Sequence, residues 1–127
     1  MDKILAEISA GELIDKITIL EIKKEKINDD QKLIDINKEL ISLNSTMKEF
    51  IPDLNKVSNL KNDLKNINLK LWDIEDSKRN AEKNKKFDEE FIRLARNVYK
   101  FNDERAKIKL LINIILGSNI KEVKSYK

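Results

Sequence analysis

The chain has 127 residues, of which 40% are hydrophobic and 39% are charged, and its formal net charge is +3. It contains no cysteine and no histidine, which excludes disulfides, thiolate chemistry, zinc sites of the Cys/His type and catalysis by a histidine base. Two glycines and one proline favour long amphipathic helices over a fold rich in turns, and the length fits one helical domain over residues 1–127.

The N-terminal part of the sequence contains a capping motif that predicts where the first helix begins. Residues 4–8 alternate apolar and other side chains, which predicts a short strand. Ser9 and Glu12 then have the spacing of a capping box, so we predict a helix over residues 10–27. Its apolar residues cover more than one narrow stripe, which predicts packing against more than one neighbour.

Two heptad seams follow in the middle of the chain. From Leu33 to Phe50, apolar residues recur at alternating spacings of three and four, and Pro52 then breaks the pattern, which predicts a helix over residues 30–50. A second seam from Val57 to Ile74 predicts a helix over residues 56–82. We expect these two helices to form a hairpin. Such seams also serve self-association between chains.

The last helix is bounded by acids and a glycine. Asp88 and the two glutamates after it suit the positive end of a helix dipole, and Gly117 supplies a left-handed cap, so we predict a helix over residues 88–116. The alternating tail, residues 120–126, is expected to pair as a strand with residues 4–8. The sequence therefore predicts an all-α fold, an antiparallel bundle of about four helices with a small two-stranded pairing of the tails.

The segment LWDIED, residues 71–76, holds the only tryptophan of the chain. Because Leu71 and Ile74 belong to the seam, Trp72 and Asp76 lie on another face of that helix. One interpretation is that the helix is central in the bundle and Trp72 is a core residue. The other is that Trp72 lines a pocket or a partner surface, where tryptophan is often an energetic anchor.

All four arginines follow this segment, in a chain that otherwise uses lysine. Arg96 and Arg105 have no acid at their helical neighbours, so each needs a partner on another helix. We expect Arg96 to reach Glu75 or another acid beside Ile74. We expect Arg105 to reach an acid on the first helix, such as Asp15 or Glu21. Two hypotheses remain open: a buried salt-bridge network that fixes the register of the bundle, or a cavity in which arginine forks bind an anionic ligand.

The candidate functional residues are polar or aromatic side chains that their own helix does not explain. They are Asp15, Glu21, Trp72, Asp73, Glu75, Asp76, Arg96, Asn102 and Arg105. We expect no metal or cofactor. In an alternative hypothesis, Glu12 and Asp15 face Asp73 and Asp76 across the bundle, and these four carboxylates hold Mg²⁺ for pyrophosphate hydrolysis.

Four blocks of sequence together resemble a family of small, uncharacterised bacterial proteins of unknown function. The blocks are EISAGELIDKITILEIKKEKI, LWDIED, FIRLARNVYKFNDERAKIKLLINIILGS and EVKSY. The resemblance covers nearly the whole chain except residues 44–66. It implies a genomic setting, because members of the family are often encoded near glycosyltransferases and other surface-polysaccharide genes, and it implies no mechanism.

An interaction or accessory module is the favoured hypothesis, since the chain offers no nucleophile–base pair and no phosphate-binding loop. Its partner would be a protein, either a second copy or another chain, and a small anionic ligand is the alternative. Lysines are interleaved with acids rather than gathered in a stripe, which argues against nucleic acid. No apolar run approaches the ~20 residues of a membrane span, and no signal peptide is evident, so we expect a cytoplasmic protein.

Overall fold

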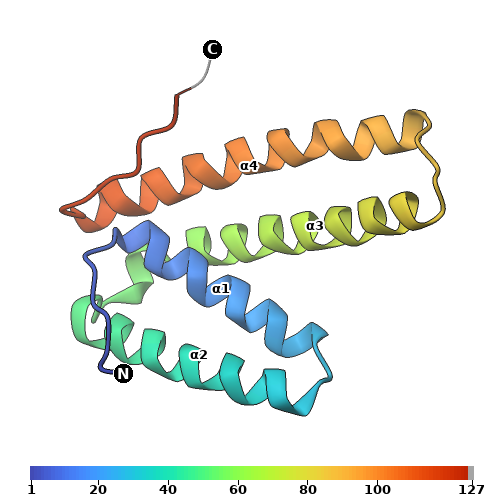
Figure 1. The fold of residues 1–127 in the computed structure, drawn as a ribbon. Helices are drawn as coiled ribbons and strands as arrows, with labels where there is room; N and C mark the ends of the chain where they lie inside the picture. Colours follow the sequence, from blue (N-terminus) through green and yellow to red (C-terminus); the bar gives the residue numbers. More distant parts are fainter. Residues whose placement is uncertain (126–127) are drawn as a thin grey trace.

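A computed structural model describes residues 1–125, and within them the chain forms four α-helices (Figure 1). They are α1 (Ala10–Lys26), α2 (Asp30–Phe50), α3 (Ser58–Lys83) and α4 (Glu89–Leu116), with a 3₁₀ turn, η1 (Leu54–Lys56), before α3. The expected all-α bundle is confirmed, and every helix bound lies within two residues of its predicted position.

Local caps explain this agreement. Ser9, Asp29 and Asp88 each accept a hydrogen bond from a backbone N–H in the first turn of their helix. Gly117 ends α4 in the left-handed conformation, with φ of 65°. The helix α3 has no side-chain cap, and η1 occupies the residues just before it, so α3 begins two residues later than predicted.

The helix α1 occupies the centre of the bundle. The helices α3 and α4 lie antiparallel, and α1 crosses them and separates them from α2 (Figure 1). It contacts all three other helices, as its broad apolar surface predicts. The predicted hairpin between residues 30–50 and 56–82 is wrong, because Pro52 and η1 redirect the chain and the extensive contacts of α3 are with α4 and α1.

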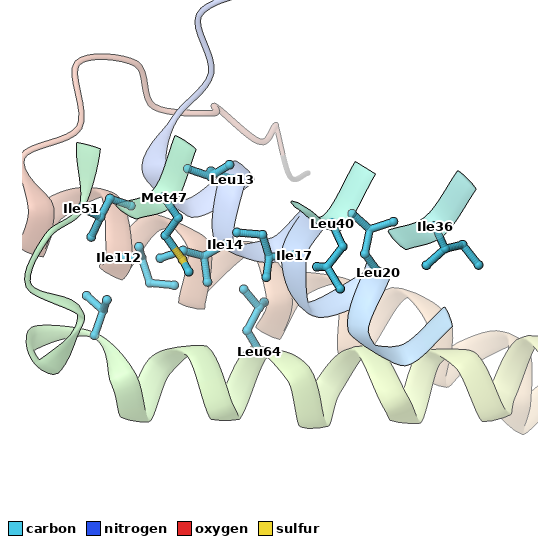
Figure 2. Close-up of a cluster of buried hydrophobic side chains, with 11 residues drawn as sticks. Leu13, Ile14, Ile17, Leu20, Ile36, Leu40, Met47, Ile51, Leu64 and Ile112 are labelled. Atoms are coloured by element: carbon cyan, nitrogen blue, oxygen red, sulfur yellow. The ribbon is translucent and has the colours of Figure 1, made fainter. Parts of the chain in front are cut away.

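Aliphatic side chains from all four helices form the core (Figure 2). Leu64 of α3 and Ile14 of α1 are fully buried, which stabilises the fold by about 2–3 kcal/mol for each side chain. Both predicted seams supply core residues, but Phe50 at the end of the first seam is 71% exposed. The core residues of the cluster are Leu13, Ile14, Ile17, Leu20, Ile36, Leu40, Met47, Ile51, Val57, Leu64 and Ile112.

The α3–α4 hairpin extends beyond the helix that covers it. With 26 residues, α3 is about 39 Å long, whereas the 17 residues of α1 span about 25 Å. We call residues 58–71 and 101–116 the covered half of the hairpin, and residues 72–83 and 89–100 its projecting half. In the projecting half only Ile74 is buried, and Phe87 and Phe91 stack edge to face at its tip.

The expected pairing of the two tails is not formed. Residues 1–125 contain no strand, and residues 4–8 meet the end of α4 through side chains instead. The amide of Asn119 donates to Glu7, and the backbone N–H of Ala10 donates to Ser118 Oγ. These contacts join the segment before α1 to residues 118–119 without a strand ladder. Tyr126, at the end of the predicted tail strand, lies outside the described residues.

None of the helices in the described part of the chain combines the length and the apolar character needed to cross a bilayer.

Candidate functional site

Asp15 of α1 is a completely buried carboxylate that joins three helices. The guanidinium of Arg105, on α4, binds both of its oxygens, with Arg105 Nε 3.0 Å from Asp15 Oδ1 and Nη2 on Oδ2. From α3, Asn68 Nδ2 donates to the same Oδ1 at 2.9 Å and to Thr18 Oγ1 at 3.0 Å. The fork, together with the amide, compensates the desolvation of the carboxylate.

Lys109 extends this network toward the end of α4. Its side chain is buried, with 9% exposed, and its Nζ lies 2.6 Å from Glu12 and 2.9 Å from Glu122. Asp15 is 4.0 Å away. Three carboxylates from α1 and the C-terminal segment therefore surround this ammonium, which ties residues far apart in the sequence to one point on α4.

Two residues bring α1 and α4 into this close approach. The backbone N–H of Gly11 donates to Asn113 Oδ1 at 2.6 Å, and Asn113 is buried. A Cβ atom on Gly11 would lie 2.4 Å from the carbonyl oxygen of Lys109, so only glycine fits there. The small residue at the start of α1 thus sets the distance over which the ion pairs form.

The network shifts the pKa values of its members in the direction that favours charge. Hydrogen bonds from the Arg105 guanidinium to Asp15 outweigh burial and raise the pKa of Arg105. Burial opposes the Lys109 ammonium, but hydrogen bonds to Glu12 and Glu122 outweigh it and raise the pKa of Lys109 above its ordinary value. The hydrogen bond from Lys109 lowers the pKa of Glu122. All three groups therefore carry charge at neutral pH.

Beside Arg105, a cavity of about 420 Å³ opens between α1 and the α3–α4 hairpin. Its polar lining is Asn68, Glu75, Asp76, Arg79, Asn102 and Arg105, and its apolar lining is Ile19, Ile22, Leu71, Trp72 and Val98. Among the hydrogen bonds formed by residues 1–125, none uses Arg105 Nη1, Asn68 Oδ1 or the amide of Asn102. The cavity therefore combines a half-buried tryptophan with polar groups that are free to bind.

The structure brings five of the candidate residues to this cavity. They are Trp72, Glu75, Asp76, Asn102 and Arg105, and Asp15 lies directly behind Arg105. The remaining three stand apart from them. Glu21 forms a long ion pair with Lys61, at 3.9 Å, and both Asp73 and Arg96 are exposed. Glu75 pairs with Lys78 at 3.7 Å, so the expected contact between Glu75 and Arg96 is wrong.

The four carboxylates of the Mg²⁺ alternative lie in separate environments. Asp15 is bound by Arg105 and Glu12 by Lys109, while Asp76 lines the cavity and Asp73 is exposed. Among the residues that the structure describes, no three acidic side chains converge in a way that suits a metal ion.

Sequence reasoning missed four members of the network. These are Asn68, Lys109, Asn113 and Glu122. The positions of Lys109 and Asn113 could have indicated their role, because both interrupt the apolar run of residues 108–116. Polar side chains within a buried run need hydrogen-bond or ion-pair partners. Asn68 gave no such indication, since one asparagine in a polar helix looks like surface, and Glu122 lies in the segment interpreted as a strand.

A second open surface is the outward side of α4, because within residues 1–125 the extensive contacts of this helix are with α3 and α1. Six side chains follow one another there at helical spacing, of which five are exposed and one, Asp103, is half-buried. We define the α4 outer face as Tyr99, Asp103, Lys107, Leu110, Leu111 and Ile114. Its four apolar or aromatic members are between 42% and 57% exposed. Neither Asp103 nor Lys107 takes part in an ion pair within residues 1–125, although they stand one helical turn apart.

Comparison with known proteins adds a family and no function. Among curated proteins and among solved structures, none matches the chain. A family described only as being of unknown function, DUF6165, matches residues 4–127, in agreement with the resemblance to an uncharacterised family. Since the match spans nearly the whole sequence, the chain belongs to the family of unknown function DUF6165.

Proposed function

We propose that this chain is a helical interaction module that assembles with a second copy of itself through the α4 outer face. The observation that supports this function is a row of side chains, exposed except for the half-buried Asp103, on the side of α4 away from α1 and α3. The row is apolar at its ends and charged in its middle. Contiguous exposed apolar side chains of this kind mark protein interaction sites.

Charge complementarity favours one arrangement of the two copies. In an antiparallel pairing about a twofold axis near residue 105, Asp103 of each copy stands opposite Lys107 of the other. The same register places Tyr99 of one copy over Leu111 of the other. Both charges that lack an ion pair in the single chain thereby gain a partner, and Tyr99 and Leu111 cover one another on each side of the axis.

The small size of the face indicates a reversible contact. Few side chains from each copy take part, so the interface falls at the low end of specific interfaces, below about 1,200 Å² in total. A dimer that forms and dissociates readily suits an accessory role. We place that role in surface-polysaccharide synthesis, the setting that the sequence resemblance implies.

Sedimentation equilibrium of a charge-swap series tests the proposal. The change Asp103→Lys sets lysines against each other twice in one dimer and should weaken association ~tenfold or more. Adding Lys107→Asp restores opposite charges and should recover it. The control Glu82→Lys makes the same change in charge at an exposed position of α3, away from this face, and should leave association unchanged.

Three results would overturn the proposal. One is a wild-type chain that stays monomeric up to its solubility limit. Another is Asp103→Lys associating as strongly as the wild type. The third is a double variant that associates as weakly as Asp103→Lys alone, because this result would leave the twofold register without support.

A further inference from the structure

We infer that the cavity beside Arg105 binds a small zwitterion with an apolar body, the chemistry of a free α-amino acid with an aliphatic side chain. The inference is independent of self-association, because the cavity lies between α1 and the hairpin whereas the α4 outer face points away from both. Its volume of about 420 Å³ falls within the range of small-molecule sites.

Arg105 supplies the binding group for a carboxylate. Two of its nitrogens are held on the buried Asp15, which fixes the plane of the guanidinium. The third nitrogen, Nη1, takes part in none of the hydrogen bonds of residues 1–125, and Arg105 lines the cavity. A donor whose orientation is set before binding loses little entropy when the ligand arrives. The Asn102 amide, on the same wall and one helical turn away, offers a further donor.

Asn68 supplies the acceptor for an ammonium group. Only 6% of Asn68 is exposed, and its Nδ2 donates hydrogen bonds to Asp15 and Thr18. Its Oδ1 has no partner among the hydrogen bonds of residues 1–125, and Asn68 is one of the residues that line the cavity. Asn68 and Arg105 bind the same oxygen of Asp15 and both line the cavity, so one small ligand can reach both residues.

The charges around the cavity favour a zwitterion over a simple anion. Arg79 and Arg105 bring positive groups to the cavity, and Glu75 and Asp76 bring negative groups, with Arg105 also paired to Asp15 and Glu75 to Lys78. A bare anion would meet the acids and a bare cation would meet the arginines, whereas a ligand with both charges can pair with groups of both signs. The aliphatic wall and the ring of Trp72 then cover the body of the ligand.

Three molecules that share one branched aliphatic body test this chemistry. L-leucine carries both charges, 4-methylpentanoate lacks the ammonium, and 3-methylbutylamine lacks the carboxylate. Fluorescence of Trp72, the only tryptophan, reports binding at the cavity, and NMR signals of the Asn68 and Asn102 side-chain amides locate it.

We expect L-leucine to bind ~tenfold or more tightly than either analogue, since each analogue leaves one set of charges unpaired. Equal affinity for 4-methylpentanoate would overturn the zwitterion, and no response to L-leucine would overturn the site.

A matched pair of variants places the site on α3. Asp76 lines the cavity, and Asp73, one turn earlier on the same helix, is exposed outside it. Asp76→Asn should weaken L-leucine binding several-fold and Asp73→Asn should leave it unchanged. Equal effects would contradict the assignment. The Asp103→Lys variant of the α4 outer face should bind L-leucine like the wild type, so failure of the site and failure of self-association are distinguishable.

Discussion

The two halves of the α3–α4 hairpin belong to the same two helices and yet differ in what they bury. In the covered half, Leu64 is fully buried and Lys109 and Asn113 are buried with partners. In the projecting half, Leu94 is half-buried although it occupies an equivalent inward position. The difference is the presence of α1, because two helices alone cannot enclose a side chain that a third helix can.

Arg96 and Arg105 show that the two halves also differ in how they bury charged side chains. Arg96 and Arg105 both lack an acid on their own helix, and by sequence they have the same need for a partner. The helix α1 carries Asp15 to Arg105, whereas Arg96 lies in the projecting half and is exposed to water. Burial by a third helix, and not the residue type, therefore decides which arginine becomes structural.

The largest expected effect is the loss of Arg105. Arg105→Ala leaves the buried Asp15 without its counter-charge and should lower the free energy of unfolding by about 3–5 kcal/mol. Arg105→Lys keeps the charge but not the fork, so it should cost less. The matched change Arg96→Ala should stay within about 0.5 kcal/mol. Urea denaturation measures the free energy of unfolding of all three variants. Equal losses of stability in Arg105→Ala and Arg96→Ala would contradict the difference between the two halves.

Truncation of one leucine in each half gives the next effect. Leu64→Ala opens a cavity in the enclosed core and should lower the free energy of unfolding by about 2–4 kcal/mol. Leu94→Ala removes a half-buried side chain whose site stays open to water, so the loss should be under about 1.5 kcal/mol. Thermal melts of both variants provide the check. A loss at Leu94 that matches the loss at Leu64 would mean that the projecting half is enclosed.

A smaller loss is expected where α1 meets α4. Gly11→Ala places a methyl group against the Lys109 carbonyl and forces the two backbones apart, which should lower the free energy of unfolding by about 1–3 kcal/mol. Ala10→Gly, at the neighbouring and less buried position, serves as the control for helix propensity and should cost less. A neutral Gly11→Ala variant would show that the approach of α1 to α4 is not fixed.

The smallest effect concerns the ion pair between Lys109 and Glu122. Because Lys109 holds the pKa of Glu122 below its ordinary 4.5, the pair stabilises the fold above pH 4.5 and this contribution is lost as the pH falls through the lowered value. The contribution should be under about 1 kcal/mol, since 45% of the Glu122 side chain is exposed.

An NMR titration of Glu122 provides the measurement for this pair. Its midpoint should lie below 4.5 in the wild type and return toward 4.5 in Lys109→Met. At the alkaline end the sign reverses, because Lys109 has a raised pKa and its contribution persists until the pH passes that value. An unchanged Glu122 midpoint in Lys109→Met would contradict the contact.

The helices could be predicted from the sequence because their caps depend on neighbouring residues. Features that depend on how the helices cross could not be predicted in this way. Ser9, Asp29, Asp88 and Gly117 act within one helical turn, so the helix bounds could be inferred from neighbouring residues. The partner of Arg105 could be inferred because the chain has few arginines. The crossing of α1 over the hairpin leaves no local signal, so the cavity, the role of Asn68 and the unpaired tails could not be inferred.

Native-state hydrogen exchange by NMR tests most directly the claim that α1 closes one half of the hairpin and leaves the other open. Amides in the covered half, such as those of residues 64–68 and 105–113, should exchange only through global unfolding. Amides of residues 76–83 and 89–97 should exchange through local opening with a smaller free energy, and Arg105→Ala should bring the two sets together. Equal protection of both halves in the wild type would contradict the account.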